Sequence, residues 1–571
     1  MGYGATRSLE RVAAAMGALE AAPIVFEAAR DVSQGGALLA LPALMVAGLL
    51  RHSAEAYALP KVFYGLSSVL VLLALMALAR IASIEQLRYA AAGEWGNLLG
   101  LDRVPEVRTL REKLKLLCAE PGRAAHWNAA LAKEWIGQQE IEQSSGLAFY
   151  IDGHVRVYHG ELTKLPRHYV PRERFYLRAT VDYWVNALDG EPFCYFNQAV
   201  DHGLVQALRT DVLPWLEANV TVSVEHRRRM AEDPRTPRFT VIFDREGYSP
   251  ELFLELQQQR IAALTYHRYP DGEDWRAEEF QEQTVKLVNG ETVRMKLAER
   301  GTHVGKRPGL WVREVRKLAP DGHQVSIVST NLTGDAASQA AALMARWSQE
   351  NYFKYMREHF GLDALVQYGT EEIPATVTVL NPAWRALDRE VRKKHAERKS
   401  LQKLQQNVDL AQPLSEAAVR QYEQLQGDLQ ERIDQLQPAL EQLRQRRKQT
   451  PRQIPVQDLP EPDRFTRLRT ERKHFLDTIK MIAYRAETSM ASTLREKLKR
   501  TDDARALLRQ IYSTEADLIP DLEAKTLTVR LHHLTQAAHD AAVQYLCDEL
   551  TATETAFPGT DLRLVYKLGS A

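Results

Sequence analysis

The spacing of apolar residues divides the chain into a helical first part, a strand-rich middle and a highly charged last part. Residues 1–135 follow helical spacing throughout, whereas the alternation typical of strands begins near residue 146. Two uncharged runs stand out in the first part, residues 35–50, "GGALLALPALMVAGLL", and residues 62–79, "VFYGLSSVLVLLALMALA". The second run reaches the lower limit of about 18 residues for a membrane span. We expect a pair of buried helices here, with a membrane hairpin as the alternative.

The rest of the first part contains a possible DNA-binding motif. In residues 83–117, "SIEQLRYAAAGEWGNLLGLDRVPEVRTLREKLKLL", one helix ends near Tyr89, and a short helix and a basic helix follow. This order resembles a helix-turn-helix, whose geometry would place residues 108–115 against DNA. Plain helical packing explains the same pattern. Residues 1–135 are therefore predicted to form a helical domain, and its contact with DNA stays open.

The middle of the chain, residues 136–385, alternates strands and helices. The segment "FTVIFDREGYSPELFLELQQQRIAALTYHR" predicts a buried strand, a helix capped by Ser249 with Pro250 at its first position, and another strand. Such a unit favours parallel strands joined by a right-handed crossover. Residues 269–330, with the turn signals "VNGET" and "APDGHQ", predict a β-rich insertion. Asp335 is then expected to cap the next helix.

The last part predicts a basic coiled coil and a mostly helical end. Residues 386–450 are rich in charge and Gln, and "TPRQIPVQDLPEP" reads as a linker before the helical domain 451–571. Pro438 should kink the coiled coil. Its apolar seam would be formed by Tyr422, Leu425, Leu429, Leu436, Leu440 and Leu443. The predicted fold class is thus multidomain α/β with flanking helical regions.

Charge and cysteine content narrow the functional classes. Acidic and basic residues balance at 74 each, yet residues 386–500 contain 25 Lys and Arg against 17 Asp and Glu. A local basic excess can hold a polyanion. The cysteines Cys118, Cys194 and Cys547 lie far apart, so a disulfide framework or cysteine zinc site is not expected. A reducing cytoplasm fits this composition best.

Three acids lie on elements that could bring them together. Asp152 ends an apolar strand in "FYIDGH", Asp244 ends another in "VIFDREG", and Glu350 lies in the helical segment "RWSQENYFKYMR". Converging carboxylates repel one another unless cations neutralise them, and oxygen-only ligation selects Mg²⁺ or Mn²⁺. A pair of ions suits phosphodiester displacement. Each acid has an ordinary alternative: Asp152 as a turn residue, Asp244 as a loop cap, Glu350 in a surface ion-pair ladder.

The neighbours of Glu350 suggest a partner for the acids. At about 100° per residue, Arg346, Lys354 and Arg357 share one helical stripe with Glu350. These cations are candidates to hold a polyphosphate beside the acids.

Other polar residues compete for a place in the site. The alternatives for the first two acids are Asp182, Asp189, Asp201 and Glu246, of which Glu246 could support Asp244 from the following loop. His154, two residues after Asp152, would face the same side of an extended strand. It could touch substrate, and a buried His with a satisfied hydrogen bond is the alternative.

At these residues the chain resembles a known family. "YIDGH", "FDREGYS" and the helix with Leu343, Arg346, Glu350 and Arg357 resemble the DDE transposases of bacterial insertion sequences, in the subgroup with a Y-x2-R-x3-E-x6-K helix. Leucine replaces the tyrosine of that motif, and arginine replaces the lysine. The resemblance implies a ribonuclease-H-like core over residues 146–370, a β insertion, and an aromatic residue that stacks on a flipped base. Trp275 and Trp311 are the candidates for that residue, and a core position is the alternative for each.

The resemblance implies a transposase that binds its own transposon ends. Asp152, Asp244 and Glu350 would be the catalytic and metal-binding residues, with two Mg²⁺ or Mn²⁺ ions, and Arg346, Lys354 and Arg357 would bind DNA. Expected partners are double-stranded transposon-end DNA, target DNA and a second copy of the chain, with no membrane. The expected location is the bacterial cytoplasm, on the nucleoid. A metal-dependent nuclease without strand transfer, a DNA-binding coiled-coil scaffold and a membrane-anchored coiled-coil protein remain the alternatives.

Overall fold

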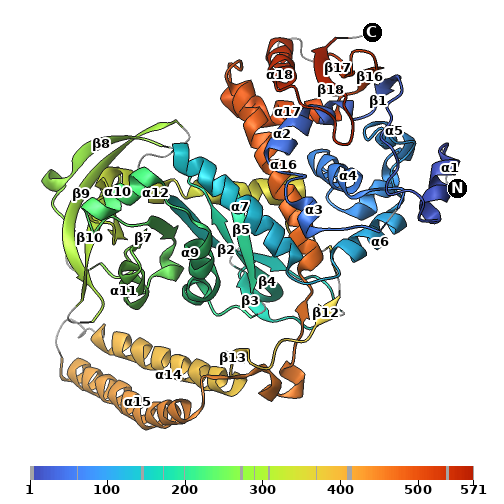
Figure 1. Ribbon diagram of the computed structural model, residues 1–571. Helices are drawn as coiled ribbons and strands as arrows, with labels where there is room; N and C mark the ends of the chain where they lie inside the picture. Colours follow the sequence, from blue (N-terminus) through green and yellow to red (C-terminus); the bar gives the residue numbers. More distant parts are fainter. Residues whose placement is uncertain are drawn as a thin grey trace. The chain divides into compact units, whose positions relative to one another are not determined.

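The computed structural model describes residues 5–569 except 61, 143–146, 162, 171–172, 199, 271–273, 288–289, 307–308, 365, 368, 408–414 and 535–538. The chain is a multidomain α/β protein, as predicted, with several sheets and many helices (Figure 1). It divides into two compact units. Unit 1 contains residues 1–157, 181–369 and 469–571, and unit 2 contains residues 158–180 and 370–468.

A mixed sheet forms the centre of unit 1. Its first five strands lie in the order β5-β4-β2-β6-β7, and β2 pairs with β6, and β6 with β7, in parallel. The parallel strands are nearly continuous runs of buried residues, because both faces of the sheet are covered. The bounds are β2 (Ala148–Val157), β4 (Phe175–Asn186, in unit 1 from residue 181), β5 (Pro192–Gln198), β6 (Phe239–Phe243) and β7 (Ile261–Tyr266).

Four antiparallel strands extend this sheet beyond β7. They occupy the segment in which a β-rich insertion is predicted, and β11 joins them to β7. Their bounds are β8 (Gln281–Lys286), β9 (Thr292–Val304), β10 (Leu310–Leu318) and β11 (Gln324–Ser329), and they form the yellow-green ribbon of Figure 1.

The helices of this region begin where the sequence indicates. Ser249 caps α11 (Pro250–Gln258), with Pro250 at the first position, and Asp335 caps α12 (Ala336–Met344). Both N-cap predictions are therefore confirmed. The remaining helices are α8 (Leu204–Ala207), α9 (Leu213–Asn219), α10 (Val224–Glu232) and α13 (Trp347–Phe360).

The apolar N-terminal runs are buried inside unit 1. Helix α4 (Leu66–Leu78) has 13 residues, and every residue from Val69 to Leu78 is buried, in part against α16 (Glu471–Arg495). Among the described residues, the structure contains no helix that is both long and apolar enough to cross a membrane. The prediction of buried helices is confirmed.

The N-terminal segment also contains a strand, which differs from the expectation of helix throughout residues 1–135. Strand β1 (Ala29–Val32) pairs with β16 (Ala516–Asp521), in the sheet β1-β16-β17-β18. A four-residue strand carries too little alternation to be recognised, and its partner lies almost 500 residues later. The helices here are α1 (Ser8–Ala15), α2 (Leu41–Val46), α3 (Ser53–Ala56), α5 (Ala92–Asn97), α6 (Val107–Leu117) and α7 (Arg123–Glu142), with the 3-10 helices η1 (Gly35–Ala40) and η2 (Ile84–Tyr89).

The C-terminal segment supplies the rest of the unit 1 core. Besides α16 and β16 it contains α17 (Ala504–Ser513), β17 (Thr526–Leu531), α18 (Asp540–Ala552) and β18 (Arg563–Leu568). Helix α16 also fixes the end of α13. Lys473 Nζ donates to the carbonyl oxygen of Leu362 at 2.8 Å, and Lys480 Nζ to that of Gly361 at 3.1 Å. Cations stabilise the C-terminal end of a helix, so these lysines hold α13 in place.

Unit 2 is built around two long helices, α14 (Pro382–Gln406) and α15 (Glu416–Gln449). Their contacts are antiparallel, since Asp388 pairs with Arg447, Arg398 with Gln437 and Gln405 with Gln430. The small apolar cluster between them contains Leu401, Leu429, Ile433 and Leu436. The short strands of unit 2 are β3 (Arg167–Val170), β12 (Thr370–Glu371), β13 (Thr378–Leu380), β14 (Gln453–Pro455) and β15 (Arg467–Leu468).

Candidate active site

Asp152 and Asp244 lie side by side because of the register of two parallel strands. Ile151 of β2 pairs with Phe243 of β6, and each aspartate is the next residue along its chain. Paired positions of neighbouring strands point to the same face of a sheet. The two carboxylates interact electrostatically, as the raised pKa of Asp152 also indicates. The structure thus brings the first two predicted acids together.

The Asp152 carboxylate is held by local contacts, and its pKa is raised. Its Oδ1 accepts a hydrogen bond from the Gly153 backbone N–H at 2.9 Å, and Arg346 Nη1 lies 2.8 Å from its Oδ2. Burial raises the pKa of Asp152 most, and the nearby Asp244 raises it further, against the opposing effect of Arg346. The negative charge at this site is therefore only partly balanced by the protein itself.

Arg346 links the first acid to the third. Its other terminal nitrogen, Nη2, lies 3.1 Å from Glu350 Oε1, so one guanidinium contacts acids that are 198 positions apart. The sequence pattern predicts one helix that runs from Asp335 past Glu350, but the structure divides it into α12 and α13, so Glu350 lies in the first turn of α13. A carboxylate is favoured at a helix N-terminus. The Glu350 side chain is 61% exposed, whereas that of Arg346 is 13% exposed.

Two further acids adjoin the aspartates. Glu246, two residues after Asp244, is exposed as a whole residue, and its carboxylate interacts electrostatically with Asp244, Asp201 and Asp152. Burial raises the pKa of Glu246 most, and these three acids add to the increase. Asp201 accepts hydrogen bonds from the Tyr183 hydroxyl at 2.7 Å and from the Gly203 N–H at 2.8 Å. In the sequence, Asp201 is only a competitor for the first two positions, whereas Glu246 is also a candidate to support Asp244. No pattern in the sequence indicates that Tyr183 contacts Asp201.

The remaining competitors have structural partners. Asp182 forms a buried ion pair with Arg156, and Asp189 accepts a hydrogen bond from the Glu191 N–H in an exposed turn. His154 is buried, stacks on Phe353 and lies 2.6 Å from Asp363 through its Nε2. Of the two interpretations of His154, the structure supports the buried histidine with a satisfied hydrogen bond.

The other two cations of the predicted stripe both lie on α13. The Lys354 side chain is exposed, and Arg357 is half-buried. Arg357 Nε is enclosed and has no hydrogen-bond partner among the residues that the structure describes. Both guanidinium and ammonium groups can contact phosphate oxygens.

The two tryptophans of the insertion differ in exposure. Trp275 is 8% exposed, and the guanidinium carbons of Arg300 and Arg316 each lie 4.5 Å from its ring centre. Trp311 is 49% exposed and covers Gly301, where even a methyl group would collide with its ring. Trp275 therefore has a core position, and only Trp311 presents a free ring face.

Helix α6, a candidate DNA-binding helix by its sequence pattern, has most of its basic side chains buried or paired with glutamates. Lys113 on α6 is buried, and burial lowers its pKa to about 8. Arg111 forms an ion pair with Glu85, and Arg108 pairs with Glu112 at 3.3 Å on the exposed side. A DNA contact by residues 108–115 stays a prediction.

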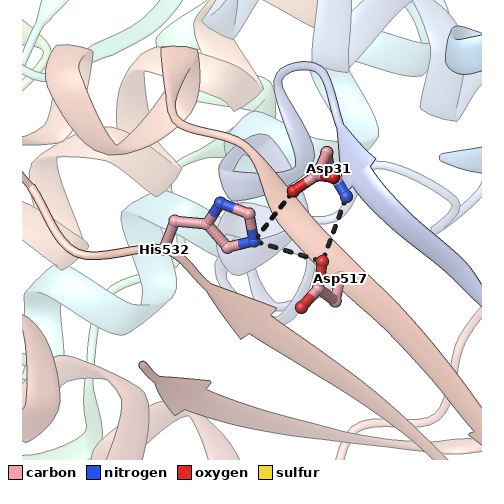
Figure 2. Close-up of side chains that lie close together, drawn as sticks. All are labelled: Asp31, Asp517 and His532. Carbon is pink, nitrogen blue, oxygen red and sulfur yellow. Dashed lines mark hydrogen bonds and ion pairs between the residues drawn. The ribbon is translucent and has the colours of Figure 1, made fainter. Parts of the chain in front are cut away.

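A compact set of potential metal ligands lies elsewhere in unit 1. In the described part of the chain, Asp31, Asp517 and His532 are the one group of three such residues with ligand atoms within 4.8 Å of one another. Figure 2 shows one ring nitrogen of His532 facing both aspartates, which are also joined to each other by a hydrogen bond. The Asp517 carboxylate already accepts hydrogen bonds from Arg530 and from the Asp31 N–H, so its charge is compensated. Asp152, Asp244 and Glu350 do not form so close a group.

Comparison with known proteins gives one result. A protein-family model described as "Transposase protein" matches residues 2–570, which span both units. No curated protein matches the sequence.

Proposed function

This chain belongs to the transposase family, and on that premise we propose that it is a DDE transposase with a ribonuclease-H-like core. Transposases cut and join DNA, so DNA is the expected partner. In the proposal, the chain binds the ends of its own mobile element and cuts and transfers them at Asp152, Asp244 and Glu350. The observation that carries the proposal is the contact of one guanidinium, that of Arg346, with Asp152 at 2.8 Å and Glu350 at 3.1 Å, beside Asp244.

The strand order supports the ribonuclease-H-like core. The strands β5, β4 and β2 lie at one end of the order, and β6 and β7 are added in parallel on the other side of β2. Asp152 lies within β2, directly after the last residue that pairs with β6, and Asp244 directly follows the end of β6, so the two acids lie on neighbouring strands of this sheet. The β8–β11 insertion separates them in sequence from the helix of Glu350.

The donor set fits a hard divalent cation. The candidate ligands are carboxylates alone, and the raised pKa of Asp152 reflects negative charge that a cation would neutralise. Asp152, Asp244 and Glu350 would hold two Mg²⁺ or Mn²⁺ ions. When bound, such ions supply Lewis-acid activation for phosphodiester displacement.

The side chains around the acids would bind and orient DNA. Arg346, Lys354 and Arg357 would contact phosphate oxygens beside the scissile bond, which provides affinity and register but little sequence information. Glu246, which interacts electrostatically with Asp244 and Asp201, would add to the negative charge that bound cations neutralise. A second copy of the chain on the paired DNA ends completes the proposed assembly.

The test is cleavage of DNA ends that flank the gene. We expect short inverted repeats there, cut by the protein only when Mg²⁺ or Mn²⁺ is present. Asp152→Ala, Asp244→Ala and Glu350→Ala should each abolish cleavage without loss of folding. Glu358→Ala is the matched control, because this glutamate lies two turns further along α13 and is 62% exposed, close to the value for Glu350.

Strand transfer separates this proposal from a nuclease. A pre-cut end with a free 3′-hydroxyl should be joined to target DNA by the wild-type chain and by Glu358→Ala. Cleavage without joining would favour a nuclease instead. Wild-type cutting by one of the three alanine variants would remove that residue from the site.

A further inference from the structure

A short β-hairpin in unit 2 gathers two arginines and two tyrosines on one face. Strand β3 and the first residues of β4 are antiparallel, with Arg167 opposite Arg178 and Tyr169 opposite Tyr176. Directly opposite residues of such a pair share a face, and so do residues two apart on one strand. These four residues therefore form one surface, which we call the Arg–Tyr face.

The tyrosines of this face are exposed to an unusual degree. Tyr169 is 48% exposed and Tyr176 is 66% exposed, and their ring centroids lie 5.4 Å apart. Single exposed apolar residues are common, but neighbouring aromatic rings left in solvent usually mark a binding surface. The pairing of the two strands does not by itself explain why both tyrosine rings are exposed to solvent.

The arginines present a second unusual feature. Like charges directly opposite each other weaken a strand pair. Neither Arg167 nor Arg178 forms an ion pair with a carboxylate among the residues that the structure describes, although Arg178 Nη1 donates to the Thr163 carbonyl at 3.2 Å. A bound anion would remove the repulsion, so the pair indicates a negatively charged partner.

One partner of a transposase satisfies both features. A DNA strand carries regularly spaced phosphates for the arginines, and its bases offer flat faces to aromatic rings, but only where they are unpaired and unstacked. An acidic protein or an anionic lipid would use the arginines and leave the rings without a matched surface. We propose that the Arg–Tyr face binds unpaired DNA, with Arg167 and Arg178 on phosphates and Tyr169 and Tyr176 stacked on bases. This proposal depends on the membership of the chain in the transposase family, and it does not depend on the proposed catalytic role of Asp152, Asp244 and Glu350.

Binding of fluorescent oligonucleotides to the full chain tests this inference. Fluorescence anisotropy with a labelled oligo-dT strand, in EDTA, keeps the measurement independent of cleavage and of the acids. Each of Tyr169→Ala and Tyr176→Ala should weaken binding at least about fivefold, the lower end for loss of one stacking contact. Tyr169→Phe and Tyr176→Phe keep the ring and should bind like wild type. A duplex of equal length should respond less to the tyrosine changes.

Salt dependence tests the arginines separately. Arg167→Ala should lower the slope of log affinity against log salt by about 0.7, the value for one phosphate contact on a single strand. Matched controls are Tyr89→Ala, at a tyrosine 83% exposed in unit 1, and Arg563→Ala, at a half-exposed arginine of β18. Both controls should bind like wild type, and thermal unfolding should show that every variant is folded.

Three results would overturn the inference. The first is oligo-dT binding by the tyrosine-to-alanine variants equal to that of wild type. The second is an equal loss for duplex and single strand, which would mean that the rings do not recognise unpaired bases. The third is a change in self-association by light scattering with unchanged DNA binding, which would make the hairpin a contact between copies. Photocrosslinking of 5-iodouracil DNA to Tyr169 or Tyr176 would support it directly.

Discussion

Unit 1 contains two ion pairs between an aspartate and an arginine, and the pKa of the aspartate is shifted in opposite directions in the two pairs. Asp182 meets Arg156 at 2.6 and 3.1 Å in the core, and Asp152 meets Arg346 at 2.8 Å beside the other acids. Burial raises the pKa of both carboxyls. For Asp182, Arg156, Lys473 and Asn197 outweigh burial, so its pKa is lowered. For Asp152, burial and Asp244 outweigh the arginine, so its pKa is raised.

The difference shows how a fold separates structure from function. At Asp182 the neighbours Arg156, Lys473 and Asn197 favour the charged form, and the Asp182–Arg156 pair is almost completely enclosed, with Arg156 5% and Asp182 1% exposed. At Asp152 the neighbouring Asp244 disfavours the charged form, and the Asp152 side chain is 22% exposed to solvent. An incompletely neutralised carboxylate at a solvent-accessible edge is typical of a functional site. A satisfied, enclosed pair contributes to stability.

The largest expected effect is on the core pair. Asp182→Ala leaves Arg156 buried without its carboxylate, which should lower the free energy of unfolding by about 3–5 kcal/mol. Urea unfolding followed by circular dichroism measures this change. Asp189→Ala, in the exposed turn that follows β4, should cost less than about 1 kcal/mol and serves as the control. Equal stability of the two variants would remove the distinction between the pairs.

The matching change at the site should affect catalysis instead. Asp152→Asn should lower end cleavage at least about 100-fold, since even the partners of metal ligands typically account for 10- to 100-fold. In metal-free buffer, the free energy of unfolding of Asp152→Asn should equal or exceed that of wild type. The variant removes a buried carboxylate that Asp244 repels in the folded state. A large loss of stability would show that Asp152 has the structural role of Asp182.

A third variant tests whether α13 is anchored independently of the acids. The Tyr355 hydroxyl donates to the buried Glu487 of α16, which also pairs with Arg80 and Arg505. Tyr355→Phe should cost about 1.5–3 kcal/mol, the usual range for a hydrogen bond to a charged group. Cleavage well below the melting temperature should be retained. Lost cleavage with unchanged stability would contradict this division of roles along the helix.

The smallest expected effect is a pH dependence. Because the pKa of Asp152 is raised in the folded state, the folded chain binds a proton more tightly there than the unfolded chain does. Wild type should therefore lose stability relative to Asp152→Asn as pH rises from the unfolded pKa near 3.8 through the folded value. The slope cannot exceed about 1.4 kcal/mol per pH unit for one proton. Unfolding of both proteins in EDTA between pH 4 and 7 measures it, and a parallel response would contradict the raised pKa.

Local signals made much of the fold predictable. Ser249 and Asp335 each precede a helical run and have a side chain that can cap it, and both do so. The uncharged run around α4 predicted burial because no polar side chain interrupts it. Asp152 and Asp244 could be identified because each follows a run of buried apolar residues, and the register of β2 and β6 places them together. Asp244 does end its strand as predicted, whereas β2 continues through Asp152 to Val157.

Long-range pairings could not be predicted in the same way. Strand β1 is only four residues long and depends on β16 for its backbone hydrogen bonds. Asp182 and Arg156 each lie in a β-rich segment, and nothing local shows that they face one another. Likewise Trp275 and Trp311 look alike in sequence, and only the tertiary contacts separate a core ring from an exposed one.

The pairing of β1 with β16 also constrains the order in which the protein can mature. Residues 29–32 lack their neighbouring strand until residues 516–521 have left the ribosome, and the Leu38 carbonyl receives its hydrogen bond from the Tyr566 hydroxyl. The apolar α4 must likewise wait for α16. Nascent chains therefore carry an uncovered apolar surface through most of translation, a state that invites chaperone binding. Products truncated before β16 cannot assemble this core, so premature termination should yield no competing inactive enzyme.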